Sequence, residues 1–255
     1  MKIQKIIYTF LLLLTITPVM AQKKEISMAR SWIKAGNNLD KAEQSMMNLL
    51  KDSANRKNEK IWNILFESLR KQYASGNEKL YLKQKYDTAS LFNIASRMFT
   101  VMASYDSIDA LPDKNGRGNP RDRKDNGAML NSLRPNLYNG GLFFIRKQNY
   151  ALAYQLLDQY IETAHQPLFE AYHYTEKDKR LPEAAYWSVY CAYKLKDTKK
   201  TLHHTYLALK DTAHYEMMLQ YLAATYQLED DSIRMLETLK EGFSRYPHSV
   251  FFYPH

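Results

Sequence analysis

Apolar residues recur at spacings of three and four along most of the chain. One stripe runs through Leu82, Tyr86, Ala89, Phe92, Ala95, Phe99 and Met102. This spacing places them on one face of a helix of about six turns. Shorter stripes cover residues 26–33, 39–49 and 62–69, with a turn at Gly36-Asn37-Asn38 and a helix end near Gly76-Asn77. No stretch shows the sustained alternation of a half-buried strand, so the pattern predicts an all-α fold.

Residues 111–126 interrupt this order, because they combine two prolines and two glycines with a dense mixture of charges. Such a segment buries little apolar area and predicts an exposed loop, with a short helix resuming over 128–133. We therefore expect four parts in the chain. They are an N-terminal leader (1–21), divergent helical repeats (22–105), a loop with a short helix (106–133) and further helical repeats (134–255).

The C-terminal half repeats one spacing of residues three times. The first row is Leu137, Gly140-Gly141, Phe144, Ala153, Leu157 and Tyr160. The second is Tyr186, Val189-Tyr190, Tyr193, Leu202, Tyr206 and Leu209. The third is Leu219, Leu222-Ala223, Tyr226, Met235, Leu239, Gly242 and Pro247. The last two rows begin 33 residues apart and the first two 49 apart, with the excess between His165 and Pro182.

This spacing resembles the tetratricopeptide repeat, which has a period of about 34 residues and the signature W-x2-L-G-x2-Y, A-x3-F, P. The last row matches best and ends at Pro247, and Gly141 supplies a small residue in the first. The second departs, since Tyr190 and Leu202 replace the small residues. The resemblance covers 134–247 and, more weakly, 25–105. It implies an α-solenoid of stacked antiparallel helix pairs, a TPR-like superhelix with a concave face.

The resemblance also implies which residues contact a partner, because the first helix of each pair lines the concave face. Carried onto this chain, the predicted groove residues are Tyr138, Asn139, Leu142, Trp187, Lys194, Gln220, Tyr221 and Gln227. Ile145, Ser188, Cys191 and Met217 belong to the same set of positions. The family's clamp for a terminal carboxylate is not matched, since Tyr138 and Leu142 stand in its place. The alternative is that these residues are core between repeats, because aromatic stripes at helical spacing usually pack inside.

Candidate catalytic and metal-binding residues are few. His203-His204 and His214 form the one local histidine cluster, but Asp211-Thr212 predicts a break between them. No acid or cysteine completes a ligand set with them, so we expect no metal site. Cys191 lies mid-helix among aromatics, where a thiol is usually packed rather than nucleophilic. No catalytic residue or cofactor is predicted.

The charged residues around the loop do not indicate a catalytic or nucleic-acid-binding site. Asp106, Asp109 and Asp113 stand beside the loop and are expected to be solvated. The basic residues of the loop lack interleaved aromatics that would stack on bases, so no nucleic-acid partner is expected. The C-terminal aromatic run 251–253 either folds back over the last groove or ends a chain shorter than its relatives.

The first residues have the layout of a secretory signal peptide. Lys2 and Lys5 precede an apolar run from Ile6 to Leu14, and Val19-Met20-Ala21 supplies a small-residue cleavage site. No later segment is apolar for long enough to span a bilayer, so no transmembrane segment is expected after cleavage. The exported protein, periplasmic or extracellular, would remain moderately basic, since the whole chain carries a formal charge of +9. With a single cysteine, its fold cannot depend on internal disulfides.

These observations predict a non-enzymatic scaffold or adaptor of the cell envelope that binds a protein or peptide segment in the concave groove. The alternative is an exported helical-repeat protein that binds a glycan or small ligand, because exposed Trp and Tyr rings can stack on sugars. An enzyme is not expected, because no constellation of catalytic residues is found.

Overall fold

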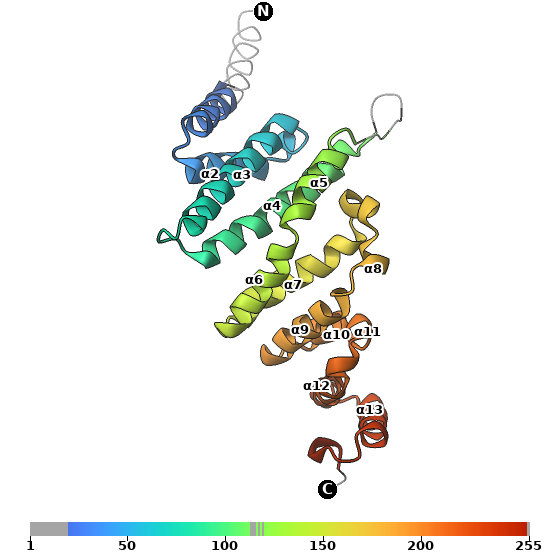
Figure 1. The fold of residues 1–255 in the computed structure, drawn as a ribbon. Helices are drawn as coiled ribbons and strands as arrows, with labels where there is room; N and C mark the ends of the chain where they lie inside the picture. The colour runs from blue at the N-terminus through green and yellow to red at the C-terminus, as the bar shows by residue number, and fades with distance from the viewer. Residues whose placement is uncertain (1–19, 113–115, 117, 119, 254–255) are drawn as a thin grey trace, which may run out of the picture. The chain divides into compact units, whose positions relative to one another are not determined.

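A computed structural model describes residues 20–112, 116, 118 and 120–253 (Figure 1). Over these residues the chain forms α-helices, short 3-10 helices and turns without a strand, which confirms the all-α class. None of the helices within the described ranges has the length and hydropathy needed to cross a membrane. Most of the predicted leader lies outside the described residues, so the signal peptide stays a prediction. The chain divides into two compact units, Met1–Asn126 and Gly127–His255.

In the first unit each helix packs on the next along the chain. A helix over residues 20–35 is followed by α2 (Leu39–Lys51), α3 (Glu59–Tyr81) and α4 (Thr88–Asp109). Helix α2 packs against α3, and α3 against α4. The turn predicted before α2 is present, with Gly36 at φ 68° and Asn38 at φ 47°. Glycine and asparagine are the residues that best tolerate this left-handed conformation.

Two helix bounds in this unit differ from the sequence prediction. Helix α3 continues past Gly76, because the glycine accommodates the ring of Tyr86 rather than ending the helix. A Cβ at position 76 would lie 2.6 Å from Tyr86 Cζ. Helix α4 begins only at Thr88, because the Asp87 carboxylate accepts hydrogen bonds from the Ala89 and Ser90 amides and so caps the helix.

A buried carboxylate connects α2, α3 and α4. Glu43 of α2 accepts a hydrogen bond of 2.8 Å from Gln72 of α3 and ion-pairs with Arg97 of α4 at 2.6 Å. The two oxygens of the carboxylate let Glu43 serve both partners at once. This polar contact fixes the relative positions of helices whose apolar faces alone would tolerate sliding.

Residues in and beside the predicted loop form more helix and more ion pairs than expected. Helix α5 spans Arg123–Leu133 and so begins five residues before the expected Ala128. Asp106 is buried and ion-pairs with Arg123 at 2.8 Å, while Asp109 lies 3.7 Å from Arg121. The expectation that these two carboxylates are solvated is therefore wrong, because α4 continues to Asp109 and faces the arginines. Asp113, Lys114 and Arg117 lie outside the described residues.

The second unit contains three helix pairs. They are α6 (Pro135–Arg146) with α7 (Tyr150–Glu162), α9 (Leu181–Lys194) with α10 (Thr198–His203) and α11 (Thr205–Ala208), and α12 (Tyr215–Leu228) with α13 (Ser232–Arg245). The helices of each pair pack together, α7 also packs on α9, and α12 packs on both α9 and α10. Each three-residue connection reverses the chain within its pair.

The connections of the three pairs have the same backbone geometry. Gln148, Lys196 and Asp230 each adopt φ 56°, and the amide that follows each bonds a carbonyl five residues back. That bond is the mark of the Schellman motif, which satisfies the last carbonyls of a helix. Next, Asn149, Asp197 and Asp231 cap the second helix through their side chains. Residues of different type at the left-handed position thus take one conformation.

Glycine allows two close approaches in the second unit, one within the first helix pair and one between α13 and the C-terminal segment that follows it. A Cβ at Gly141 of α6 would lie 2.5 Å from Leu157 Cγ of α7, the pairing that the repeat spacing predicted. A Cβ at Gly242 of α13 would lie 2.3 Å from the ring of Phe252. Phe252 belongs to the 3-10 helix η5 (Val250–Phe252), so the aromatic C-terminal run folds back onto α13.

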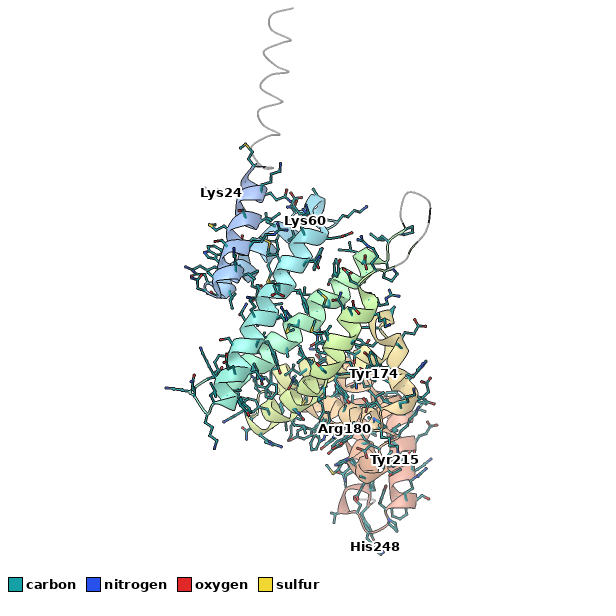
Figure 2. All side chains as sticks on the ribbon, turned by 45° about the horizontal axis from the view of Figure 1, so that its top comes forward. Lys24, Lys60, Tyr174, Arg180, Tyr215 and His248 are labelled. Carbon is teal, nitrogen blue, oxygen red and sulfur yellow. The ribbon has the colours of Figure 1, made fainter. Side chains whose placement is uncertain are left out.

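The extra residues between the first two pairs form a compact cover over a buried arginine. They comprise η2 (Thr163–His165), η3 (Pro167–Tyr172) and α8 (Tyr174–Lys177), and Figure 2 labels Tyr174 and Arg180 near the end of this segment. The guanidinium of Arg134, whose side chain is 6% exposed, lies between the rings of Tyr160 and Tyr174 at 3.7 and 3.8 Å. It donates to Thr163 Oγ1 and the Tyr160 carbonyl and pairs with Asp178 at 2.5 Å.

We predict that Gly141→Leu destabilises the second unit. The added side chain must displace Leu157, and overpacking of this kind costs about 1–3 kcal/mol. Urea unfolding followed by circular dichroism measures the loss. Asn139→Leu is the matched control, because residue 139 lies on the exposed side of the same helix. Equal midpoints for the two variants would contradict the close packing of α6 on α7.

We predict that Asp178→Asn destabilises the protein by about 3–5 kcal/mol, since it leaves the buried Arg134 charge without its counter-ion. Burial opposes ionisation of Asp178, but hydrogen bonds from Tyr160 and Arg134 outweigh it and lower the pKa. A lowered pKa stabilises the folded state at pH values above the unfolded-state pKa of about 3.9, and this stabilisation is lost as the pH falls through the folded-state pKa. The stability gap between wild type and variant should therefore narrow below about pH 4 in acid titrations of unfolding. A gap independent of pH would exclude this ion pair.

Candidate functional site

The first helix of each pair in the second unit leaves one stripe of residues at least partly exposed. On α6 the stripe includes Asn139 and Leu142, and on α12 it includes Glu216, Gln220 and Gln227. The stripe on α9, called the α9 stripe from here on, consists of Glu183, Trp187, Tyr190 and Lys194. Its members are spaced by four, three and four residues, which places them on one helix face. This stripe is the most aromatic of the three.

Contacts between side chains link the α9 stripe to its neighbouring helices. Trp187 and Tyr190 pack edge to face with centroids 5.8 Å apart, and Tyr190 makes the same kind of contact with Tyr150 of α7. Tyr190 also lies 6.0 Å from the ring of Tyr221 on α12. Aromatic pairs of this geometry are favourable beyond the area they bury. The two aromatic residues of the stripe therefore form one packed platform with their neighbours rather than two independent side chains.

Polar groups complete the platform at both ends. Glu183 hydrogen-bonds the phenol of Tyr138 on α6 and lies 3.5 Å from Trp187 Nε1. At the other end, Lys194 Nζ lies 5.5 Å from the centre of the Tyr190 ring. The stripe thus offers one carboxylate, one ammonium and two aromatic rings along a single line.

The phenols around the stripe remain neutral. Burial, with a further contribution from the hydrogen bond to Tyr150, raises the pKa of Tyr190 to about 12. The pKa of Tyr138 is raised mainly by burial, with a further contribution from the Glu183 carboxylate. The pKa of Tyr221 is also raised mainly by burial, with a further contribution from Tyr186. None of these groups is activated as an acid or base near neutral pH. Their chemistry here is hydrogen bonding and packing.

The structure divides the predicted groove residues into two sets. Six lie on the three exposed stripes, namely Asn139, Leu142, Trp187, Lys194, Gln220 and Gln227. Tyr138 and Tyr221 are each only 7% exposed, so they support the stripe from below. Within the exposed set, α9 brings Trp187 and Lys194 onto one face. Gln220 is held by its own helix, with its amide 3.4 Å from Glu216.

Helix α9 exposes a different side from the one that the repeat signature implied. Ser188 and Cys191 were expected on the concave face, yet both are fully buried. Burial raises the pKa of the Cys191 thiol to about 12, so this cysteine is a packed residue and not a nucleophile. Glu183 and Tyr190 stand on the exposed side instead. The spacing of four, three and four through Trp187 was the sequence signal that could have identified them.

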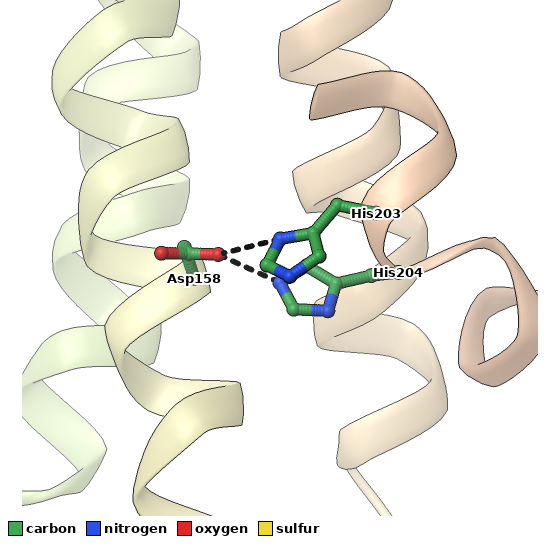
Figure 3. Close-up of side chains that lie close together, drawn as sticks. All are labelled: Asp158, His203 and His204. Atoms are coloured by element: carbon green, nitrogen blue, oxygen red, sulfur yellow. Dashed lines mark hydrogen bonds and ion pairs between the residues drawn. The ribbon is translucent and has the colours of Figure 1, made fainter. Parts of the chain in front are cut away.

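A cluster that the sequence did not reveal lies between α7 and α10. Asp158 Oδ1 lies 2.7 Å from His204 Nε2 and 3.5 Å from His203 Nδ1, as Figure 3 shows. Burial opposes ionisation of Asp158, but the hydrogen bond and charge of His204, the charge of His203 and the Tyr154 hydroxyl outweigh it and lower the pKa. His214 belongs elsewhere, since its Nδ1 lies 2.7 Å from Asp211 and its ring stacks on Tyr186.

The C-terminal end of the second unit carries an exposed apolar pocket of 490 Å³ between α13 and η5. Its lining is almost wholly apolar and consists of Leu236, Leu239, Lys240, Phe243, Phe251, Phe252 and Tyr253. Phe252 closes the base of the pocket, while Leu236, Phe243 and Phe251 remain exposed. An exposed apolar patch of this kind is typical of a contact surface.

The fold and the site together define an all-α protein with an aromatic, mixed-polarity surface stripe and an Asp-His-His cluster. Comparisons of the chain with protein-family models, with curated proteins and with solved structures find no match. The function is therefore argued from the site itself.

Proposed function

We propose that this protein is a helical-repeat scaffold that binds a segment of a partner protein along the α9 stripe. The observation that carries the proposal is the Trp187–Tyr190 platform, which packs against neighbouring helices yet remains partly exposed. Trp and Tyr dominate the binding energy of protein interfaces, because they bury large areas with little loss of conformational freedom. Such a platform is costly to leave facing water unless something covers it.

The proposal includes a TPR-like solenoid in the second unit. Three observations support it: the repeated residue spacing, the identical turns at Gln148, Lys196 and Asp230, and the packing of each helix pair on the next. Helix pairs that stack in this way cannot bury their apolar faces alone. Stacked first helices would align the stripes of α6, α9 and α12 into one extended surface.

The chemistry of the stripes favours a peptide segment of mixed polarity. Glu183 and Lys194 supply opposite charges, while Asn139 and Gln220 supply amides that both donate and accept hydrogen bonds. An extended or helical segment with aromatic or aliphatic anchors and polar flanks would match this arrangement. We further propose that binding takes place in the cell envelope, on the basis of the leader-like residues 1–21.

We predict that Trp187→Ala combined with Tyr190→Ala weakens partner capture by about 10- to 100-fold, the usual cost of removing central aromatic anchors. A photo-crosslinking residue at position 194, the exposed end of the stripe, should give discrete adducts in envelope extract. Mass spectrometry of the adducts identifies the partner, and its affinity is then measured with purified proteins.

Tyr206→Ala is the matched control, because Tyr206 is an exposed aromatic on α11, outside the stripes. Leu236→Ser with Phe251→Ser tests the C-terminal pocket separately. Equal loss of binding in the control and the stripe variant would refute the proposed site. A wild-type protein that captures no protein but shows a thermal shift with oligosaccharides would favour the glycan-binding alternative.

A further inference from the structure

Three potential metal ligands from distant parts of the chain converge in the second unit. One oxygen of Asp158 and one ring nitrogen each of His203 and His204 all lie within 4.8 Å of one another. Figure 3 shows Asp158 on α7 facing both imidazole rings, and both contacts end on the same carboxylate oxygen. Asp158 is the acid that local sequence reasoning could not supply, because it is 45 residues away from His203 in the chain.

The backbone at His204 is shaped so that two adjacent histidines reach the same carboxylate. In an uninterrupted helix, neighbouring side chains do not face one another. Here α10 ends at His203, α11 begins at Thr205, and His204 between them has φ −107° and ψ 15°. This break brings the two rings to a centroid distance of 4.1 Å with 31° between their planes. The corresponding helices α7 and α13 of the other two pairs are continuous.

The burial of the three groups suits a site that is anchored on one side and open on the other. The His204 side chain is 7% exposed and fixed against Asp158, while His203 is 55% exposed at the rim. Tyr154 hydrogen-bonds Asp158 and lies 3.4 Å from His203 Nδ1. A hydroxyl that bonds a ligating carboxylate can hold it in place, as outer groups do around bound metals.

We propose that Asp158, His203 and His204 bind a divalent transition metal of the Zn²⁺ type, with a fourth position open to water or to a ligand from a partner. Two imidazole nitrogens and one carboxylate oxygen suit Zn²⁺ and its neighbours, whereas Ca²⁺ and Mg²⁺ prefer oxygen ligands alone. Tetrahedral coordination at 2.0–2.1 Å separates ligand atoms by about 3.3 Å. The Asp158 oxygen lies 2.7 Å from the His204 nitrogen and 3.5 Å from the His203 nitrogen, on either side of that value, and the ligand atoms of the two histidines lie within 4.8 Å of each other.

Metal binding requires a free lone pair on the coordinating nitrogen of each histidine. A hydrogen on that nitrogen therefore moves to the other nitrogen of the same ring or leaves as a proton. The metal would replace the direct hydrogen bond between His204 and Asp158. It would also connect α7 of the first pair to the α10–α11 break of the second. The site is independent of the α9 stripe, because no stripe residue takes part in it.

The proposal is tested by titrating the metal-free full-length protein with ZnCl₂ in a calorimeter. Wild type should bind one Zn²⁺ per chain, and His203→Ala should weaken binding by at least about 10-fold, since it removes a ligand. His203 is exposed, so its removal should leave the circular-dichroism spectrum unchanged. His248→Ala is the matched control for weak binding by surface histidines and should bind as wild type does.

A second probe reports the ligand set directly. Bound Co²⁺ should give the strong visible absorption of a four-coordinate site in wild type, and Asp158→Asn should reduce it. Absence of saturable Zn²⁺ binding in wild type would overturn the proposal. Equal affinities for wild type and His203→Ala would also overturn it, because binding would then occur elsewhere.

Discussion

The second unit depends on the close apolar contact between the two helices of each pair. Its main helices have only 12 to 14 residues, a length at which an isolated helix is marginal in water. Each is stable because it buries an apolar face against its partner. The contact of Gly141 with Leu157 shows how close the helices come, since no larger residue fits. Every other feature of the unit, including the exposed stripes, is positioned by this packing.

Polar residues then decide which arrangement of the packed helices forms. Glu43 serves Gln72 and Arg97 in the first unit, and Asp178 serves Arg134 in the second. A buried charge without a partner is costly, so slipped or rotated arrangements that separate these groups are disfavoured. The segment between η2 and α8 can be understood in the same way. It lengthens the spacing between two helix pairs because it encloses the Arg134 guanidinium.

Function, on our proposals, lies on the surfaces that this packing leaves free. The α9 stripe presents partly exposed aromatic rings, and its Tyr190 packs against Tyr150 of α7 and Tyr221 of α12. The Asp-His-His cluster arises where the second helix of one pair breaks at His204 and faces Asp158. The two sites use different helices. One protein could therefore hold a partner and a metal ion without the two sites competing for the same residues.

The sequence by itself determined the all-α class, the turn before α2 and the pairing of α6 with α7, because these follow from local periodicity and from small residues at fixed spacing. It did not determine that Asp106 is buried, that Ser188 and Cys191 face inward, or that Tyr190 faces outward. It also gave no sign that Asp158 meets His203 and His204. Those facts depend on which helix lies against which side of its neighbour. Only the tertiary structure decides this, since burial and charge pairing between distant residues are set by packing and not by local sequence.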